Sequence, residues 1–348
     1  MIEDAIADYQ AAVGEGWTNL TVGRDLTRGV DRADASRFLA GLVEGALTFV
    51  HADPSVPQLV PWTTADRRWA DNGLDSSYWY APLDDRHRYR VHGRRQGECY
   101  LSFTVYAGTP AHPEHTVLNV NHLGLGAGPG EPFSLDIDPP PDACYLIVRQ
   151  YFDDASNAIP ASLAIDVVDG PRAVAPDDAA LAARWRIAAD FIRTMTHPPE
   201  PQVKVSYVSE TINRIGVPSG WREQEGAGRG TPDQTYALGR FRLGPDDALV
   251  MDTVLRSSVY TSVVLWNQFG QTIDRRLHTS TLNRNELVTG SDGRVRIVVA
   301  HRDPGVPNWL DAAGRETGTI FWRFLLAAEQ PEPIEAHVVP VDGMEPLA

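Results

Sequence analysis

The segment that begins at His301 combines side chains used in acid–base chemistry. His301 ends an apolar strand-like run and is followed by Arg302 and Asp303, and then by Asn308 and Trp309. Because alternate residues of a strand share a face, His301 is expected where the apolar face meets the mouth of a β-sandwich. An imidazole oriented by a carboxylate can act as a general base, so His301, Arg302 and Asp303 are candidate catalytic residues, and Asn308 and Trp309 candidate substrate contacts. The alternative is a capping turn that only closes the sandwich end.

Two arginines interrupt hydrophobic strand-like runs, Arg149 in the first half of the chain and Arg323 in the second. A guanidinium that is buried in such a run needs an acceptor. Each arginine is therefore either a ligand for a substrate carboxylate or a member of a structural ion pair. Both are kept as candidate substrate-binding residues.

Aromatic residues supply a third group of candidates. Tyr78 and Tyr80 follow Asp75 in a strand-like run, and Trp266 ends another run. The run from Asp75 to Tyr80, with Arg90 and His92 nearby, could line a pocket for a flat apolar ligand, although aromatic clusters beside strands also serve as core. Trp266 is kept as a further candidate substrate-binding residue. His112 and His115 have a His-x-x-His spacing, but no third ligand follows at a defined distance, so no metal site and no cofactor are expected.

Composition narrows the classes of partner. The chain has 348 residues, two cysteines and a formal net charge of −15, which disfavours nucleic acid and anionic membranes. The N-terminus lacks a secretory signal, and we expect a cytoplasmic protein. Phosphate-binding loops, dinucleotide fingerprints and nucleophile-elbow motifs are not found in the sequence.

The elements that must position these residues follow from periodicity. Residues 1–60 are predicted to be a helical segment, and 176–200 a connecting helix that begins at Pro176-Asp177-Asp178. The first helix is expected to end at Gly14 and Gly16. Residues 61–175 and 201–348 alternate with period two between turn signals, which predicts two β modules.

The two strand sets resemble each other. Tyr100-Leu-Ser corresponds to Tyr260-Thr-Ser, and the runs that contain Arg149 and Arg323 correspond in order and spacing. This repetition indicates an internal duplication. The predicted fold is therefore mainly β, with duplicated antiparallel β-sandwich or jelly-roll-like modules, an N-terminal helical segment and a connecting helix.

The stretch Asp303-Pro-Gly-Val-Pro-Asn-Trp-Leu-Asp311, with Gly318-Thr-Ile-Phe-Trp-Arg323, resembles the bacterial family called domain of unknown function 1214. The likeness extends to Asp71 with Asp75, and to Val148-Arg-Gln-Tyr-Phe152. The first half departs from this pattern, because the segment that starts at Asp138 lacks the Asn-Trp-Leu of the second half. The resemblance implies a β-sandwich fold and no particular activity.

Three functions are consistent with these patterns. The first is a cofactor-independent enzyme or binder of a small hydrophobic or oxygenated metabolite, such as a terpenoid, steroid or lipid-like molecule, with acid–base chemistry by His301 and Asp303. The alternatives are a non-catalytic ligand-binding or assembly protein and a carbohydrate-active protein. A homo-oligomer is expected in each case, because open sheet edges tend to pair.

Overall fold

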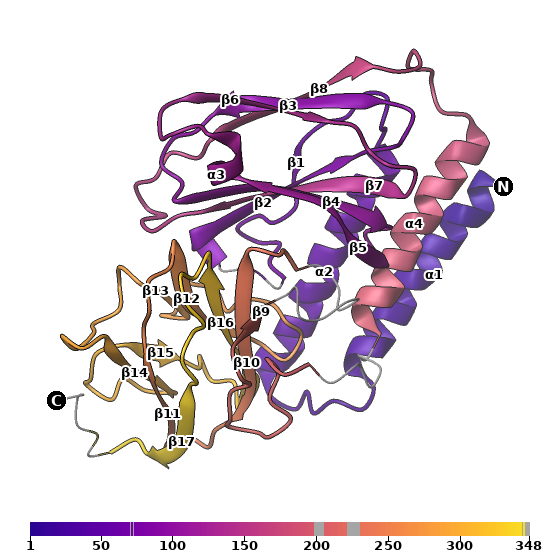
Figure 1. Cartoon of the computed structure of the whole chain (residues 1–348). Coiled ribbons are helices and arrows are strands. Elements are labelled where there is room, and N and C mark those ends of the chain that lie inside the picture. Colours follow the sequence, from indigo (N-terminus) through magenta and orange to yellow (C-terminus); the bar gives the residue numbers. More distant parts are fainter. Residues whose placement is uncertain (70, 72, 198–204, 221–229, 343, 345–348) are drawn as a thin grey trace. The chain divides into compact units, whose positions relative to one another are not determined.

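A computed structural model describes residues 1–69, 71, 73–197, 205–220, 230–342 and 344 (Figure 1). The chain divides into two units. Unit 1 comprises Met1–Arg67 and Ser76–Pro201, and unit 2 comprises Arg68–Asp75 and Gln202–Ala348. The short segment Arg68–Asp75 thus belongs to unit 2, although the chain on both sides of it belongs to unit 1.

Three long helices of unit 1 pack against one another, α1 (Ile2–Thr21), α2 (Gly29–His51) and α4 (Asp178–Thr196). The predicted start of the connecting helix is confirmed, since the Asp177 side chain accepts a hydrogen bond from the backbone N of Ala180 at 2.8 Å. Such a cap satisfies one of the backbone N–H groups that the first helical turn leaves without a partner.

The prediction that the first helix ends at Gly14 and Gly16 was wrong. Helix α1 continues to Thr21 because Gly16 lies at the contact with α4. A Cβ atom at Gly16 would stand only 3.0 Å from the side chain of Ile192. The burial of this close contact outweighs the low helix propensity of glycine.

The strands of unit 1 form two sheets that share one hydrophobic core. Five strands follow the order β1-β2-β7-β4-β5 and three follow the order β6-β3-β8, all antiparallel. Leu101, Phe103 and Val148 of the larger sheet belong to the same core as Tyr89 and Val91 of the smaller one. The bounds are β1 (Val60–Pro61), β2 (Ser76–Pro82), β3 (Arg88–Arg94), β4 (Tyr100–Gly108), β5 (Pro113–Asn121), β6 (Pro132–Ile137), β7 (Ala143–Tyr151) and β8 (Ser162–Asp169), with the one-turn helix α3 (His122–Leu125) after β5.

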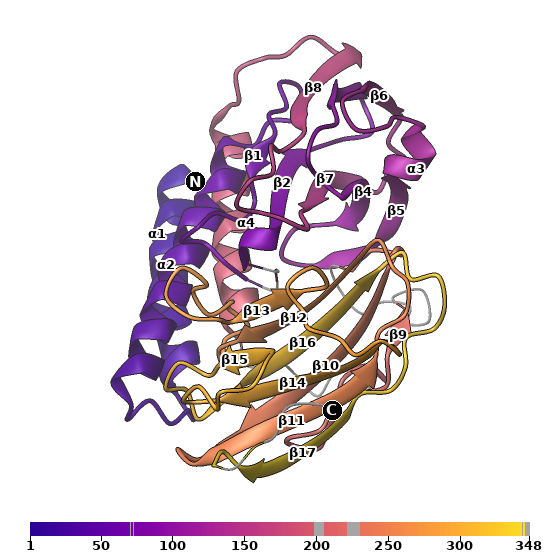
Figure 2. The same ribbon diagram turned by 90° about the vertical axis from the view of Figure 1, so that its left-hand side faces the viewer.

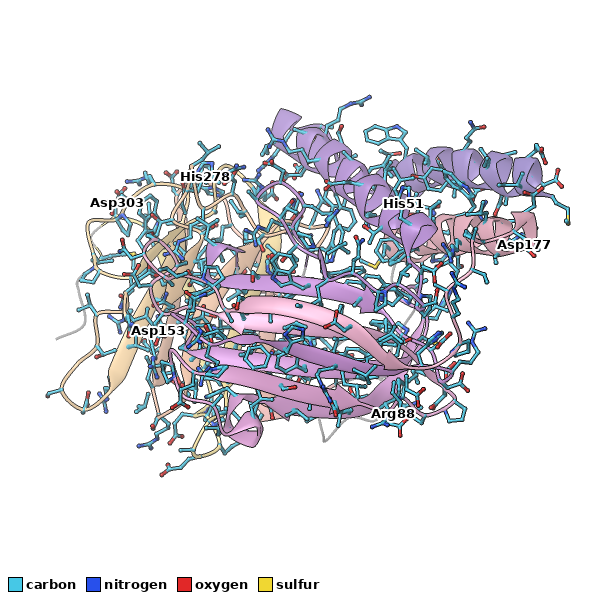
Figure 3. The ribbon with its side chains drawn as sticks, turned by 90° about the horizontal axis from the view of Figure 1, so that it is seen from above. His51, Arg88, Asp153, Asp177, His278 and Asp303 are labelled. Carbon is cyan, nitrogen blue, oxygen red and sulfur yellow. The ribbon has the colours of Figure 1, made fainter. Side chains whose placement is uncertain are left out.

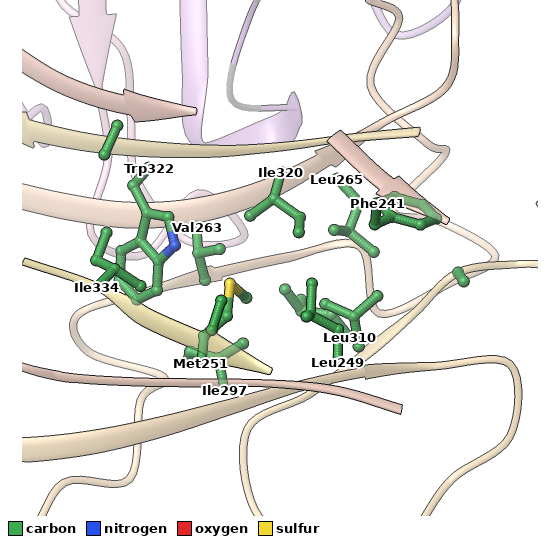
Figure 4. Close-up of a cluster of buried hydrophobic side chains, with 14 of the residues drawn as sticks. Phe241, Leu249, Met251, Val263, Leu265, Ile297, Leu310, Ile320, Trp322 and Ile334 are labelled. Carbon is green, nitrogen blue, oxygen red and sulfur yellow. The ribbon is translucent and has the colours of Figure 1, made fainter. Parts of the chain in front are cut away.

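Unit 2 also contains two sheets, of order β13-β12-β16-β10-β9 and β15-β14-β11-β17, in which β14 and β15 pair in parallel (Figure 2). Val263 and Trp322 of the first sheet pack in one core with Met251 and Ile297 of the second (Figure 4). The bounds are β9 (Ser219–Gly220), β10 (Gln234–Arg242), β11 (Asp247–Val254), β12 (Tyr260–Trp266), β13 (Thr281–Asn283), β14 (Arg294–Ala300), β15 (Trp309–Asp311), β16 (Thr317–Leu325) and β17 (Glu335–Pro340), with a 3-10 turn η1 at Gly73–Asp75.

The strand orders of the two units correspond element by element. The order β2-β7-β4-β5 in unit 1 matches β10-β16-β12-β13 in unit 2, and β6-β3-β8 matches β14-β11-β17. The registers agree as well: Arg149 is paired with Tyr78 and Ser102, and the corresponding Arg323 with Tyr236 and Ser262.

The mainly β fold with helices at the N-terminus and between the strand sets is confirmed by this architecture. Among the described residues, no helix is both long and apolar enough to cross a lipid bilayer.

Candidate ligand-binding site

A cavity of about 670 Å³ opens in unit 1 beside the C-terminal half of α2. This volume lies in the range of pockets that hold small organic molecules, roughly 300–1,000 Å³. Its lining comes from α2, the segment that follows α2, strands β1 and β2, and the segment between these strands: Glu44, Leu47, Thr48, His51, Ala52, Asp53, Val56, Gln58, Val60, Arg67, Tyr80 and Pro82.

The helical repeat explains why one side of α2 contributes four of these residues. Glu44, Leu47, Thr48 and His51 stand at positions i, i+3, i+4 and i+7, which lie on one face of a helix. Phe49 on the same helix is buried and packs edge to face against Phe191 of α4. Helix α2 ends at His51, which Figure 3 labels. Because residues after His51, such as Asp53 and Val56, also line the cavity, it extends past the last helical turn.

Arg67 and Glu44 form an ion pair at the cavity wall, with Nη1 of Arg67 2.9 Å from Oε1 of Glu44. The Arg67 side chain is only 6% exposed and also donates hydrogen bonds to the backbone oxygens of Trp62 and Pro61. Burial lowers the pKa of Arg67 from its usual value. The Glu44 side chain is 56% exposed and thus remains reachable from solvent.

The second carboxylate of the lining belongs to Asp53, which accepts hydrogen bonds from two residues. Its Oδ1 accepts bonds from the backbone N and the hydroxyl of Ser55, at 3.0 and 2.7 Å, and its Oδ2 accepts one from Arg184 at 2.8 Å. Partial burial acts to raise the pKa of Asp53, but the bonds from Ser55 and Arg184 outweigh it and lower the pKa. Asp53 is therefore ionised at neutral pH.

Tyr80 closes the apolar side of the cavity. Its ring contacts Phe49 edge to face and lies near Trp62 and Tyr145, with centroids 5.5 to 6.0 Å apart. Burial raises the pKa of Tyr80, so the hydroxyl stays neutral. The cavity thus combines aliphatic and aromatic walls with two carboxylates, each paired with an arginine.

Tyr80 is the one residue of the sequence-derived candidates that lines this cavity. Tyr78, its neighbour on β2, has its hydroxyl 2.5 Å from that of Tyr151. Trp266 in unit 2 stacks on Phe321 at 4.3 Å and donates a hydrogen bond to the backbone oxygen of Asp71.

The candidates around His301 lie in unit 2 and have separate partners. Nε2 of His301 is 3.2 Å from the backbone oxygen of Leu243, whereas Arg302 pairs with Asp342 at 2.8 Å. Asp303, in the exposed loop labelled in Figure 3, accepts a bond from the backbone N of Gly305 at 2.8 Å.

Asn308 and Trp309 bind backbone groups. Asn308 has a positive φ of 59° and donates to the oxygens of Val288 and Arg296 at 2.7 and 3.0 Å. The indole N–H of Trp309 donates to the oxygen of Ala300 at 3.2 Å. These contacts belong to the turn geometry that we gave as the alternative to catalysis.

Arg149 and Arg323 are buried in corresponding places. Arg149 donates to the hydroxyls of Thr104 at 2.9 Å and Tyr106 at 2.7 Å, and its guanidinium lies 5.5 Å from the centre of the Tyr78 ring. The guanidinium of Arg323 lies 5.6 Å from the centre of the Tyr236 ring. Both positions favour cation–π contact.

A buried acidic cluster in unit 2 also escaped the sequence analysis. Asp75 is fully buried and accepts hydrogen bonds from Tyr260 and Asn283, each at 3.0 Å, as well as an ion pair from Arg275. Arg275 also pairs with Glu286. Burial raises the pKa of Asp75 although Arg275 acts in the opposite direction.

Apart from Tyr80, the residues that line the cavity were missed because each of them alone gives only a weak signal in the sequence. Glu44, Leu47, Thr48 and His51 have the spacing of a single helix face, and this pattern could have suggested a ligand-facing side of α2. Arg67 lies in a stretch without periodicity, so nothing in its neighbours indicated that it would meet Glu44.

Comparison with known proteins supports the fold. No family model matches the chain, and neither does any curated protein. The chain is similar to an uncharacterized protein from Burkholderia cenocepacia, with 28% identity and a TM-score of 0.85 over 97% of each chain. It is also similar to the VPA0106 protein from Vibrio parahaemolyticus, with 13% identity and a TM-score of 0.48 over 86% of this chain and 97% of that one.

Proposed function

We propose that the chain is a ligand-binding protein that holds a small, largely apolar, oxygenated metabolite in the cavity of unit 1. The observation that carries the proposal is the cavity of about 670 Å³, whose lining combines Leu47, Val56 and Val60 with a few polar groups. Such a mixture, in which apolar walls give affinity and a few polar groups fix orientation, is typical of small-molecule sites.

Binding without catalysis is better supported than acid–base chemistry by His301 and Asp303. Within the part of the chain that the structure describes, no hydrogen bond joins these two side chains, and each of them bonds to a backbone group instead. A general base must lie within hydrogen-bond reach of the substrate proton that it removes. The cavity, in contrast, is formed by unit 1, to which neither residue belongs.

Native mass spectrometry followed by denaturing extraction tests the proposal. We expect a small organic molecule to co-purify with the wild-type protein and to be missing from the double variant Leu47→Trp/Val56→Trp, whose indoles would occupy the cavity. Val174→Trp is the matched control, because Val174 is a 79% exposed residue of the same unit and lies outside the cavity lining. Circular dichroism checks that all three proteins are folded.

An equal load of ligand in wild type and double variant contradicts the proposal. If no small molecule is extracted from any of the proteins, titration with 2-naphthol replaces the extraction. The proposal is then also contradicted if the wild-type protein does not bind 2-naphthol, or if the double variant binds it equally well.

We further propose that the two units arose by internal duplication and that the chain is a member of the family called domain of unknown function 1214. The matching strand orders and the matching registers of Arg149 and Arg323 support the duplication. The stretch from Asp303 to Asp311 supports the family. We also propose that the chain forms a homo-oligomer, because β8 and β17 are edge strands of their sheets and edge strands tend to pair. Light scattering coupled to size-exclusion chromatography tests this proposal.

A further inference from the structure

The polar groups of the cavity differ in how completely they are used. Both oxygens of Asp53 already accept hydrogen bonds, from Ser55 and from Arg184. In Glu44, Oε1 accepts a bond from Arg67, whereas no hydrogen bond from another described residue reaches Oε2. A carboxylate oxygen can accept two bonds, so Glu44 is the carboxylate of the lining that retains an unused acceptor.

The charges around the cavity are balanced locally. Arg67 stands 2.9 Å from Glu44, and Arg184 stands 2.8 Å from Asp53. An anionic ligand would approach two carboxylates whose arginine partners are already engaged with them. A cationic ligand would compete with Arg67, which the backbone oxygens of Trp62 and Pro61 also hold in place.

The rest of the lining mixes apolar side chains with three further polar residues, Thr48, His51 and Gln58. Leu47, Val56, Val60 and Pro82 add aliphatic surface, and Tyr80 adds an aromatic ring with a neutral hydroxyl. Burial of the apolar surface of a ligand favours binding, whereas a polar group is tolerated only where it meets a partner. The chemistry that fits is therefore an apolar body with at least one hydrogen-bond donor.

We propose that the cavity selects a neutral, hydroxyl-bearing apolar molecule whose hydroxyl donates a hydrogen bond to Oε2 of Glu44. This assignment rests on the proposed ligand-binding function and adds the class of ligand and the residue that recognises it. Glu44 acts as the acceptor, and the Leu47–Val60 side of the cavity holds the apolar body.

Three naphthalene probes of similar shape test the assignment by equilibrium dialysis at pH 7. They are 2-naphthol, a neutral donor; 2-methylnaphthalene, which has no donor; and 2-naphthoate, an anion. A hydrogen bond to a charged acceptor is worth roughly 1.5–3 kcal/mol, which corresponds to about tenfold or more in affinity. We expect 2-naphthol to bind at least tenfold tighter than 2-methylnaphthalene and 2-naphthoate to bind most weakly.

Glu44→Met removes the acceptor at nearly constant length and should abolish the preference, while the affinity for 2-methylnaphthalene stays within about twofold. Glu15→Met is the matched control, because Glu15 is also a half-exposed glutamate of a helix and is paired with an arginine. Its Oε2 lies 2.6 Å from Nε of Arg193, which belongs to α4. The control should keep the preference for 2-naphthol unchanged.

The outcomes separate this assignment from the proposed function. Equal binding of 2-naphthol and 2-methylnaphthalene, lost in Leu47→Trp/Val56→Trp, overturns the assignment and leaves the binding function in place. A tenfold preference that survives Glu44→Met also overturns the role of Glu44. If no probe binds the wild-type protein, the assignment fails, and the proposed function fails with it only if extraction also releases no small molecule from the wild-type protein.

Discussion

Removal of Arg275 should destabilise unit 2, because it leaves the buried carboxylate of Asp75 without its cation. The side chain of Asp75 is 1% exposed and that of Arg275 20% exposed. Breaking a buried ion pair by removing one partner costs about 3–5 kcal/mol. Since the bonds from Tyr260 and Asn283 remain, we expect Arg275→Met to cost about 3 kcal/mol of unfolding free energy at pH 7.

The cost should depend on pH with a definite sign. Burial already raises the pKa of Asp75 in the native state, and Glu286 acts in the same direction, so loss of Arg275 raises that pKa further. The native variant then binds a proton that the native wild type releases, which reduces the penalty as pH falls through the raised pKa. In that window the cost should shrink by up to about 1.4 kcal/mol per pH unit.

Arg276→Met is the control, because the neighbouring Arg276 is 47% exposed and pairs with Asp274 at the surface. Such pairs contribute about 0–1 kcal/mol. Hydrogen exchange of peptides from β12 and β16, measured against urea at pH 8 and at pH 5, gives the free energy of unfolding of this unit. Equal costs for the two variants, or an Arg275→Met cost that grows at pH 5, would refute the reasoning.

Five further substitutions test the helices and the candidate site. Gly14→Ala should stabilise the protein by about 0.5–1 kcal/mol, because no atom lies within 4 Å of its added Cβ, whereas Gly16→Val should destabilise it by about 1–3 kcal/mol through contact with α4, as urea denaturation would show. Asp177→Ala should cost about 1 kcal/mol in the same assay, since the cap of α4 is lost, and no change would contradict the role of the cap. His301→Ala and Asp303→Asn should leave the dialysis affinity for 2-naphthol within about twofold, and a larger loss in either would move the site to unit 2.

The sequence was informative where structure depends on neighbours along the chain. Period-two runs located the strands around Arg149 and Arg323, and the Asp177 signal located the start of α4. These patterns arise because alternate strand residues share a face and because a helix start needs acceptors for its free N–H groups. Gly16 marks the limit of such reasoning, since its tolerance in α1 depends on a helix that begins more than 150 residues later.

The candidate site could not be predicted in the same way, because it depends on contacts between distant positions. Arg67 pairs with Glu44 across 23 residues and Arg184 with Asp53 across 131. Asp75 and Arg275 are separated by 200 residues. Neither partner of such a pair leaves a local pattern, so a buried charge of this kind shows only when the fold is known.

The placement of the cavity bears on which part of the chain carries function. The β modules of the two units have the same strand order and the same buried arginine over a tyrosine ring. The cavity, however, takes most of its lining from α2 and the segment that follows α2. In the described part of unit 2 no α-helix occurs, and so the repeated strands alone do not build this site. We therefore expect Arg149 and Arg323 to stabilise the β modules, and the helices of unit 1 to supply ligand recognition.

If this division is right, Arg149→Met should lower the stability of unit 1 but leave the preference for 2-naphthol over 2-methylnaphthalene intact. A protein that stays folded but loses this preference would assign Arg149 to the ligand instead.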